Sequence, residues 1–386
     1  MSKIQMYQRS NGEFGIRNHL LIIPTVICAN QVANRVMQLV PDSVAIPHQH
    51  GCSQIGADKQ RTFDVLAGTG KNPNVGAVLI ISLGCEVIDP AELASEISKT
   101  GKRVEWFDIQ SVGGSIKAIQ HGTQLAKEMR TELDRMEQVA VPLAELKVGV
   151  KCGGSDATSG LCSNPALGAA VDQLIASGGS AVIGETTEII GAEHVLAQRA
   201  ADESTRLRLY EIVASFEAEV ARMGEDMRGG NPSPGNIAGG LTTIEEKSLG
   251  CISKGGSTPL KGVIEYAEAL PKDGLYFMDS PGNDIECVSG MAAGGVHLVC
   301  FTTGRGTPTG AAVVPVIKIT GNKQMYERMQ DNMDVDVRDV LLGGMTLKQA
   351  GDVIWQEIIE VAGGKLTKAE LLGHAEFSIN RIGPSL

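Results

Sequence analysis

The sequence has few aromatic residues and no long apolar segment. Aromatic residues make up 4% of the 386 residues, so Val, Ile, Leu and Ala must form the core. No apolar run approaches the roughly 20 residues that span a bilayer, and the first ten residues lack the apolar region of a secretory signal. Cations are also scarce, with 34 Lys and Arg against 45 Asp and Glu. The net charge of −11 argues against nucleic acid or an anionic membrane as partner. From the missing apolar span and secretory signal we expect a cytoplasmic protein.

No pair of cysteines has the C-x-x-C spacing, so a structural zinc ribbon is not expected. In a cytosolic chain the cysteines are expected to be thiols or metal ligands rather than disulfides. The eight are Cys28, Cys52, Cys85, Cys152, Cys162, Cys251, Cys287 and Cys300.

Short continuous apolar runs alternate with helical segments along the chain, which predicts parallel sheets covered on both faces. The expected strands are 20–24, 44–47, 75–82 and 103–107, then 148–152, 180–184, 275–279, 297–302 and 314–319. We therefore predict an α/β protein with two Rossmann-like halves, mostly parallel sheets and a helical C-terminal region over 334–372. The expected domains are residues 1–145 and 146–386, joined by a linker at 138–145.

A loop rich in glycine and serine, KCGGSDATSGLCSNP at 151–165, lies between the expected strand 148–152 and a helix at 166–177. This order presents backbone N–H groups and a helix N-terminus to an anion. The loop also carries a thiol, a carboxylate, hydroxyls and an amide. An ordinary strand–helix connection made of small residues would have a similar sequence. The polar residues at the other strand ends favour a ligand-binding loop instead.

Three strands of the first half end close to a cysteine, namely Cys28, Cys52 and Cys85, and Cys152 ends the next strand. The carboxyl ends of parallel strands share one edge, so these thiols are expected to converge there. Glu185 and Glu188 stand just past another strand. Arg305 lies in a glycine-rich turn suited to pairing with a carboxylate or sulfonate.

Several of these loops together resemble the altronate and galactarate dehydratase family of sugar-acid lyases. The matching segments are NGEFGIRN at 11–18, HQHGC at 48–52, LGCE at 83–86, CGGSD at 152–156 with SG at 159–160 and NP at 164–165, NPSPGN at 231–236, KSLG at 247–250, and TGRGTP at 303–308 with Lys318. They follow the family order over nearly the whole chain. Those dehydratases begin with a small SAF-type domain, whereas this chain starts at the catalytic part.

The resemblance implies β-elimination from a 2-hydroxy acid to a 2-oxo acid. Family members that divide the two parts between subunits favour (2R)-sulfolactate as substrate, losing sulfite to give pyruvate. The alternative is a hydro-lyase acting on altronate, galactarate or a related sugar acid, and pocket volume distinguishes three-carbon from six-carbon substrates. A non-catalytic subunit is a third reading, disfavoured because the polar loops are intact. The resemblance also implies a small SAF-domain subunit and a homo- or hetero-oligomer.

A carbon acid next to a carboxylate is weakly acidic, so a divalent metal is expected to stabilise the enediolate. The resemblance implies Fe²⁺, with an iron–sulfur cluster or Mn²⁺ as alternatives. The candidate metal ligands are Cys28, Cys52, Cys85, Cys152 and Glu86, and His48 with Glu86 or Glu185 would suit mononuclear iron. The catalytic candidates are His48, Glu185 and Lys247. The substrate-binding candidates are Arg17, Asn18, His50, Ser155, Asp156, Asn164, Asn236, Arg305 and Lys318.

Overall fold

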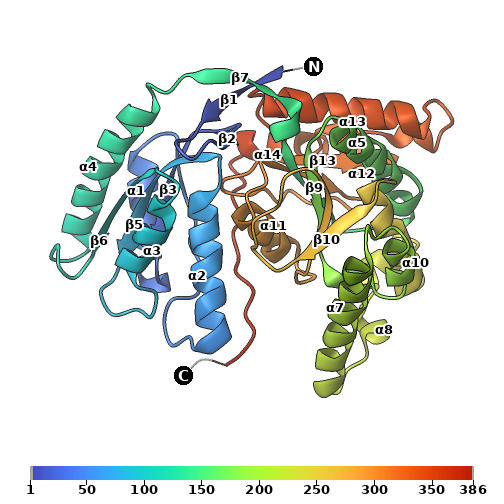
Figure 1. Cartoon of the computed structure of the whole chain (residues 1–386), viewed down its shortest axis with the longest axis horizontal. Helices are drawn as coiled ribbons and strands as arrows, with labels where there is room; N and C mark the ends of the chain where they lie inside the picture. Colours follow the sequence, from blue (N-terminus) through green and yellow to red (C-terminus); the bar gives the residue numbers. More distant parts are fainter. Residues whose placement is uncertain (1–2, 385–386) are drawn as a thin grey trace.

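The computed structural model describes residues 3–384, and it places two parallel sheets side by side with helices on their faces (Figure 1). The smaller sheet has the order β4-β3-β5-β6. Its strands are β3 (His19–Pro24), β4 (Ser43–Ala45), β5 (Val75–Ser82) and β6 (Arg103–Asp108). Successive residues of a strand point to opposite faces. Leu20 and Ile22 therefore pack under α1 (Asn30–Leu39) and α4 (Ser115–Leu133), while Leu21 and Ile23 face α2 (Gly56–Lys71) and α3 (Pro90–Ser98).

The larger sheet has seven parallel strands in the order β10-β11-β9-β8-β12-β13-β14. The strands are β8 (Lys147–Cys152), β9 (Ser180–Ile183), β10 (Leu260–Ile264), β11 (Gly274–Met278), β12 (Leu298–Thr302), β13 (Val316–Thr320) and β14 (Val335–Asp336). Helices α5 (Asn164–Ala176) and α13 (Leu347–Ala362) cover one face. On the other face α11 (Asp284–Ala293) packs against α2 of the first half, so one apolar cluster lies between the two sheets. The α/β prediction is confirmed.

A small antiparallel sheet, β2-β1-β7, joins the two halves. It consists of β1 (Lys3–Gln8), β2 (Phe14–Gly15) and β7 (Gln138–Pro142). The sequence suggested a linker at 138–145, but residues 138–142 form β7. This strand is held by pairing with β1, where Val141 is buried beside Ile4 and Met6. The domain division at 145/146 stays a prediction.

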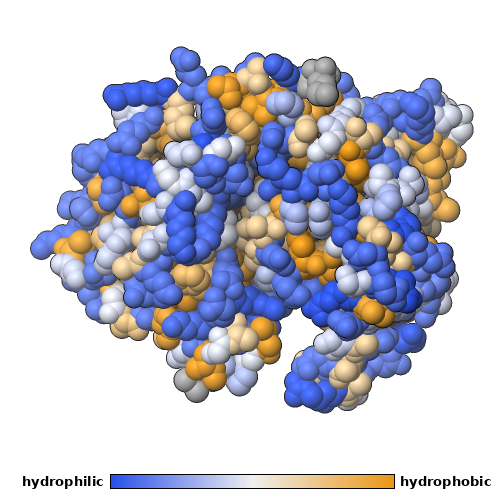
Figure 2. All heavy atoms as spheres, viewed as in Figure 1, coloured by the Kyte–Doolittle hydropathy of each residue, from blue (hydrophilic) through white to orange (hydrophobic). Residues whose placement is uncertain are grey.

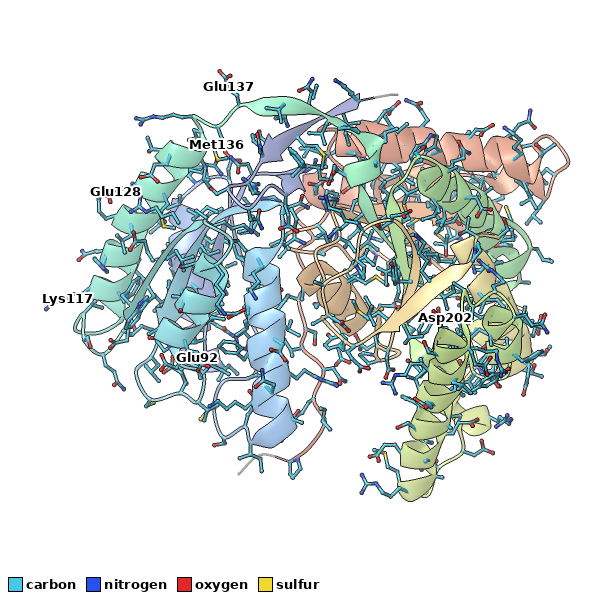
Figure 3. All side chains as sticks on the ribbon, viewed as in Figure 1. Glu92, Lys117, Glu128, Met136, Glu137 and Asp202 are labelled. Atoms are coloured by element: carbon cyan, nitrogen blue, oxygen red, sulfur yellow. The ribbon has the colours of Figure 1, made fainter. Side chains whose placement is uncertain are left out.

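The segment after β9 forms an arm beside the larger sheet. It contains α6 (Glu193–Ala197), α7 (Glu203–Arg222), α8 (Met227–Gly230), α9 (Pro234–Ala238) and α10 (Ile244–Ile252). Helix α7 projects from the body of the molecule (Figure 1). Lys117 and Glu128 on α4 point away from the smaller sheet (Figure 3), as expected for the polar face of an amphipathic helix.

The C-terminal region is only partly helical. It contains β14, α13 and α14 (Lys368–Leu371), with α12 (Lys323–Arg328) just before it. Residues 374–384, here called the C-terminal strap, then run without regular structure between α11 and α2 (Figure 1). Ile379 is buried, and the carboxylate of Asp58 on α2 accepts the N–H groups of Ile382 and Gly383 at 2.6 and 2.7 Å. Within residues 3–384, no helix is both long and apolar enough to cross a membrane.

Candidate active site

A cavity of about 810 Å³ opens at the carboxyl ends of β8, β9 and β11, where open α/β sheets usually bind their ligands. Its walls come from the loops after these strands and from the arm α7–α10. The surface is hollowed beside the projecting arm (Figure 2). The polar and charged lining residues are Ser155, Glu185, Thr187, Glu188, Glu225, Asp226, Asn231, Ser233, Asn236, Lys247, Asn283 and Asp284. Five of these are acidic and one is basic.

A buried lysine holds two carboxylates at the floor of this cavity. Lys151, in the interior of the larger sheet, places its Nζ 2.6 Å from Glu185 and 2.5 Å from Asp284. Its ammonium also lies 5.1 Å from the ring centroid of Phe301. Burial lowers the pKa of Lys151, but Glu185 and Asp284 outweigh that effect and raise it well above the usual value. A buried charge with such partners is held in one position.

A second charged cluster lies beside the first. Glu188 pairs with Lys254 at 2.6 Å, and both side chains are buried. The Sγ of Cys152 lies 3.0 Å from Glu188, 3.1 Å from Lys254 and 3.3 Å from the Sγ of Cys251. Lys247, on the cavity wall, is 4.0 Å from Glu188 and donates to Asn231 at 2.9 Å. Strand β8, helix α10 with the turn that follows it, and the turn after β9 thus bring two lysines, two thiols and a carboxylate together.

The two glutamates of the cavity have pKa values displaced in opposite directions. Burial and the neighbouring Glu188 raise the pKa of Glu185 well above its usual range. Burial also acts against ionisation of Glu188, but Lys254, Lys151 and Lys247 outweigh it and hold the pKa of Glu188 well below normal. The surroundings therefore oppose ionisation of Glu185, apart from Lys151, and favour ionisation of Glu188.

The backbone of Glu185 is strained. Its φ of +71° is the left-handed conformation that non-glycine residues rarely adopt. Ser280, just after β11, holds this turn, because its Oγ accepts the N–H of Glu185 at 2.7 Å and its carbonyl accepts that of Thr186 at 3.0 Å. Gly184 packs against the same serine, since a methyl group there would lie 2.8 Å from Ser280 Oγ. Strain of this kind concentrates at functional sites.

The loop after β8 continues into a π-helix, Ser159–Ser163, before α5 begins. Asp156 braces this loop: its carboxylate accepts from the Ser159 N–H at 3.1 Å and from Asn322 Nδ2 at 2.7 Å. Ser155 differs, because its buried Oγ has no hydrogen-bond partner among the described residues. Ser155 and Lys247 also line an adjoining cavity of about 300 Å³ with Asp156 and Asn164.

The structure therefore brings Glu185, Lys247, Ser155 and Asn236 to one cavity, with Asp156 and Asn164 next to it. Arg305 is exposed on a neighbouring loop and donates its backbone N–H to the Gly154 carbonyl at 2.8 Å. Lys318 is buried behind that loop and hydrogen-bonds the carbonyl of Thr309, and burial lowers its pKa to about 8.

The remaining predicted polar residues have other partners. Arg17 pairs with Glu370 at 2.8 Å, and Asn18 accepts from Arg9 at 2.7 Å. His48 is buried with its Nε2 2.7 Å from the Pro24 carbonyl and its Nδ1 accepting the His50 N–H at 3.1 Å. His50 places its Nε2 2.9 Å from the carbonyl of Ile379 in the strap. These four residues are not brought to the cavity; the two histidines line a smaller one together with Glu286 and the C-terminal strap.

The four cysteines expected on one edge divide into two groups. Cys28, Cys52 and Cys85 are exposed at the carboxyl edge of the smaller sheet, whereas Cys152 is buried at the end of β8 in the larger sheet. Glu86 lies with the first group. Its carboxylate accepts the N–H groups of Leu83, Gly84 and Cys85 at 2.9, 2.7 and 2.8 Å and the hydroxyl of Thr25.

One trio of side chains could bind a metal ion. The ligand atoms of Cys152, Glu188 and Cys251 lie within 4.8 Å of one another, and no other such trio occurs within residues 3–384. Two thiolates and a carboxylate suit a soft divalent ion. However, the ammonium of Lys254 already lies against both Cys152 and Glu188. A metal ion in this position would have to displace it, so the arrangement as it stands fits a lysine better than a metal.

Several residues of the site were not singled out from the sequence: Lys151, Cys251, Lys254 and Asp284. Lys151 could have been found from the sequence, because a lysine inside an otherwise apolar strand needs buried carboxylates as partners. Lys254 follows α10 in a Ser-Lys-Gly-Gly turn and resembles an ordinary surface lysine.

Comparison with known proteins matches both parts of the chain to one family. Residues 6–134 match the second domain of D-galactarate dehydratase/altronate hydrolase proteins, and residues 143–385 match the C-terminal domain of D-galactarate/altronate dehydratases. The chain belongs to this dehydratase family, and it is a lyase.

Relatives of known activity fall into two substrate groups. The altronate dehydratase of Bacillus subtilis is 38% identical over 98% of this chain and 78% of its own length. The (2R)-sulfolactate sulfo-lyase subunit beta of Chromohalobacter salexigens is 39% identical over 97% of this chain and 96% of that subunit. The galactarate dehydratase of Escherichia coli is 32% identical over 93% of this chain and 72% of its own length. Identity thus does not separate the two groups.

Proposed function

We propose that this chain catalyses β-elimination from a 2-hydroxy acid at the 810 Å³ cavity. The observation that carries the proposal is the Glu185–Glu188 pair, two neighbouring carboxyl groups on the cavity wall whose pKa values are displaced in opposite directions. Elimination needs one group that accepts the proton of carbon 2 and one that gives a proton to the leaving group. Glu188, ionised, takes the first role and Glu185, protonated, the second.

Lysines supply the positive charge that an anionic substrate needs in this acidic cavity. Lys247 reaches the wall, where its ammonium can bind the substrate carboxylate, while Lys151 and Lys254 fix the two glutamates from behind. The free hydroxyl of Ser155 is positioned to hydrogen-bond a substrate oxygen. Fe²⁺, which we propose as the cofactor, would act as a Lewis acid on the carboxylate and 2-hydroxyl when bound.

The first candidate substrate is (2R)-sulfolactate, giving pyruvate and sulfite. It is supported by the beta subunit that aligns with this chain over 96% of its length. By its name, that relative works with another subunit, and we propose a small SAF-type partner for this chain as well. The second candidate is a sugar acid such as altronate. The cavity volume favours it, because about 810 Å³ is far more than a three-carbon acid fills.

The test is an anaerobic assay of the chain with Fe²⁺, with and without a co-expressed SAF-type subunit, on sulfolactate and on altronate. Pyruvate with sulfite would establish the first candidate. A 2-oxo-3-deoxy acid from altronate, with no sulfite, would establish the second and exclude the first. If neither product forms although both carboxylates and metal are in place, the assignment of the cavity to elimination fails.

A further inference from the structure

Two buried cysteine sulfurs lie in contact beside the glutamates of the cavity. The Sγ of Cys152, at the end of β8, is 3.3 Å from the Sγ of Cys251, in the last turn of α10. The two residues are 99 positions apart in the sequence, so the fold brings them together. A disulfide places its sulfurs about 2 Å apart, and closing this pair therefore requires a shift of only about 1 Å.

The side chain of Asn164 holds the neighbours of both cysteines. Its Nδ2 donates to the carbonyl of Gly250 at 3.0 Å, and its Oδ1 accepts the hydroxyl of Thr302 at 2.5 Å. Gly250 precedes Cys251 in the chain, and Thr302 on β12 lies opposite Cys152 in the parallel sheet. One amide thus ties the backbone beside one cysteine to the strand beside the other, so the fold fixes the separation of the two sulfurs.

A lysine makes one of these thiols reactive. The Nζ of Lys254 lies 3.1 Å from the Sγ of Cys152, and a cation this close stabilises a thiolate, the form of cysteine that attacks oxidants. Glu188, 3.0 Å from the same sulfur, opposes the thiolate, but its own charge is paired with Lys254 at 2.6 Å. Cys152 therefore has both a neighbouring cation and a second thiol, the arrangement in which oxidation leads to a disulfide.

The thiol pair borders a cavity that a small oxidant can enter. Cys251 lines the adjoining cavity of about 300 Å³, together with Gly250 and Lys247. This volume is about ten times the share of one water molecule in the liquid, so hydrogen peroxide fits. Ser155 and Lys247 belong to this cavity and to the main one. The thiols are therefore next to the proposed substrate site.

We propose that Cys152 and Cys251 form a reversible disulfide that switches the elimination off. The inference rests on the proposed function, because the switch acts on Glu188. The Cys152 thiolate attacks one oxygen of a peroxide; the O–O bond breaks, hydroxide leaves and takes up a proton, and a sulfenic acid remains. The Cys251 thiol then attacks the Cys152 sulfur, the S–O bond breaks, and the thiol proton leaves with the hydroxide as water. The two thiols together give two electrons to the peroxide.

The disulfide changes the surroundings of the Glu188–Lys254 ion pair. In the reduced chain the Cys152 sulfur contacts both members of this pair. In the disulfide the same sulfur is neutral, has no proton to donate and is drawn towards Cys251. Lys254 lies in the turn 253–255 that directly follows α10, so a pull on this helix also displaces its ammonium. Elimination should therefore stop until a thiol reductant opens the bond.

The first test maps the bond in the full-length chain. Chelator-treated protein is exposed to hydrogen peroxide, its free thiols are alkylated, and its peptides are analysed by mass spectrometry before and after reduction. We expect a linked peptide pair, Cys152 with Cys251, that separates on reduction with dithiothreitol. Cys300→Ala removes another buried thiol, one that packs in the apolar core, and should form the same link. Cys251→Ser should form none, and circular dichroism establishes that each variant is folded.

The second test follows activity on the substrate that the reduced chain accepts. Oxidation, removal of the peroxide and reloading with Fe²⁺ should leave little of the elimination rate, and treatment with dithiothreitol before reloading should restore it. In Cys251→Ser the loss should no longer be reversible, because Cys152 is then oxidised further to a sulfinic acid.

Three results would overturn the proposal. They are a sulfinic acid on Cys152 of the wild-type chain in place of the disulfide, an oxygen-bridged link between Cys152 and Lys254, and full activity of the disulfide form. If the disulfide forms but the reduced chain eliminates nothing from either substrate, the proposed function fails and the thiol pair stands.

Discussion

At the scale of single residues, the central feature is a pair of neighbouring glutamates, Glu185 and Glu188, whose pKa values are displaced in opposite directions. Burial and Glu188 raise the pKa of Glu185 against the effect of Lys151, while three lysines lower the pKa of Glu188. The division of roles therefore depends on the positions of the lysines. Two carboxyl groups alone would not determine it.

Replacing Glu185 by Gln keeps a hydrogen-bond donor of the same shape but removes the transferable proton. We expect kcat to fall by about 10²–10⁴, the usual contribution of general acid–base catalysis. Glu188→Gln should lose a similar amount. The steady-state rate on the accepted substrate is the measurement, and Glu203→Gln, on the exposed start of α7, is the control. A Glu185→Gln enzyme with more than a tenth of normal kcat would contradict the assignment.

Lys254 is expected to matter for charge rather than for shape. Lys254→Met retains much of the side-chain volume but leaves Glu188 and Cys152 without the ammonium that contacts both. The pKa of Glu188 should then rise, so the limb of the pH–rate profile that reports its ionisation should move to higher pH. An unchanged profile would mean that Lys254 has no part in holding the charge on Glu188.

Two buried histidines should make the fold sensitive to mild acid. Burial lowers the pKa of His48 and of His297 to about 4. The unfolded chain takes up protons near pH 6.5 and the folded chain only near pH 4, so stability is full above 6.5 and falls as the pH drops towards 4. Each group accounts for about 3 kcal/mol across that interval.

The free energy of unfolding, measured by denaturant titration from pH 7 to pH 4, checks this expectation. In His297→Gln the fall should be smaller by about 3 kcal/mol, since one titrating group is gone. His121→Gln alters an exposed histidine and should follow the wild-type curve. If His297→Gln follows it too, His297 is not the source of the acid sensitivity.

At the scale of elements, the loops after the strands carry the chemistry, and glycine lets them approach one another. Gly51 has φ +94° and packs on the backbone of Thr25 and Val26. Gly51→Ala should therefore force the Cys28 and Cys52 loops apart. Gly12 has φ +84° and open space around it, so Gly12→Ala should cost only the strain of an alanine at positive φ.

We expect Gly51→Ala to lower the unfolding free energy by about 2 kcal/mol more than Gly12→Ala. Equal effects of the two changes would show that the loops do not need this close contact.

The elements themselves were largely predictable, because continuous apolar runs of five to eight residues between glycine-rich turns indicate buried parallel strands. Leu260–Ile264 escaped notice, since Lys261 and Gly262 interrupt its apolar run, and Gln138–Pro142 resembled a linker because it pairs only with β1. The sequence also indicated that Glu185 and Cys152 follow strands. It could not indicate that Lys254 reaches Cys152, because the two residues are 102 positions apart in the sequence.

At the scale of the whole molecule, the C-terminal strap links the two halves. It covers the apolar cluster between the sheets with Ile379 and ties itself to α2 through Asp58. Burial of one isoleucine and two N–H bonds to a carboxylate contribute together about 3–5 kcal/mol.

A chain ended after Gly373 should lose about that amount of stability, and the loss should fall mainly on the junction between the halves. Scanning calorimetry is expected to resolve two transitions where the full chain shows one. Asp58→Asn, which weakens only the tie to the strap, should lower the melting temperature without dividing the transition. A single transition in the shortened chain would mean that α2 and α11 hold the halves together without the strap.

The strap also bears on how the protein is made. Asp58 is synthesised early, yet the backbone groups that it binds in Ile382 and Gly383 are 324 and 325 residues later in the chain. The first half can form its own sheet on the ribosome, but its contacts with the strap must wait until residues 382 and 383 have left the ribosome. During that interval α2 presents the apolar side that α11 and the strap later cover, so a nascent chain of this protein is a natural client for a chaperone.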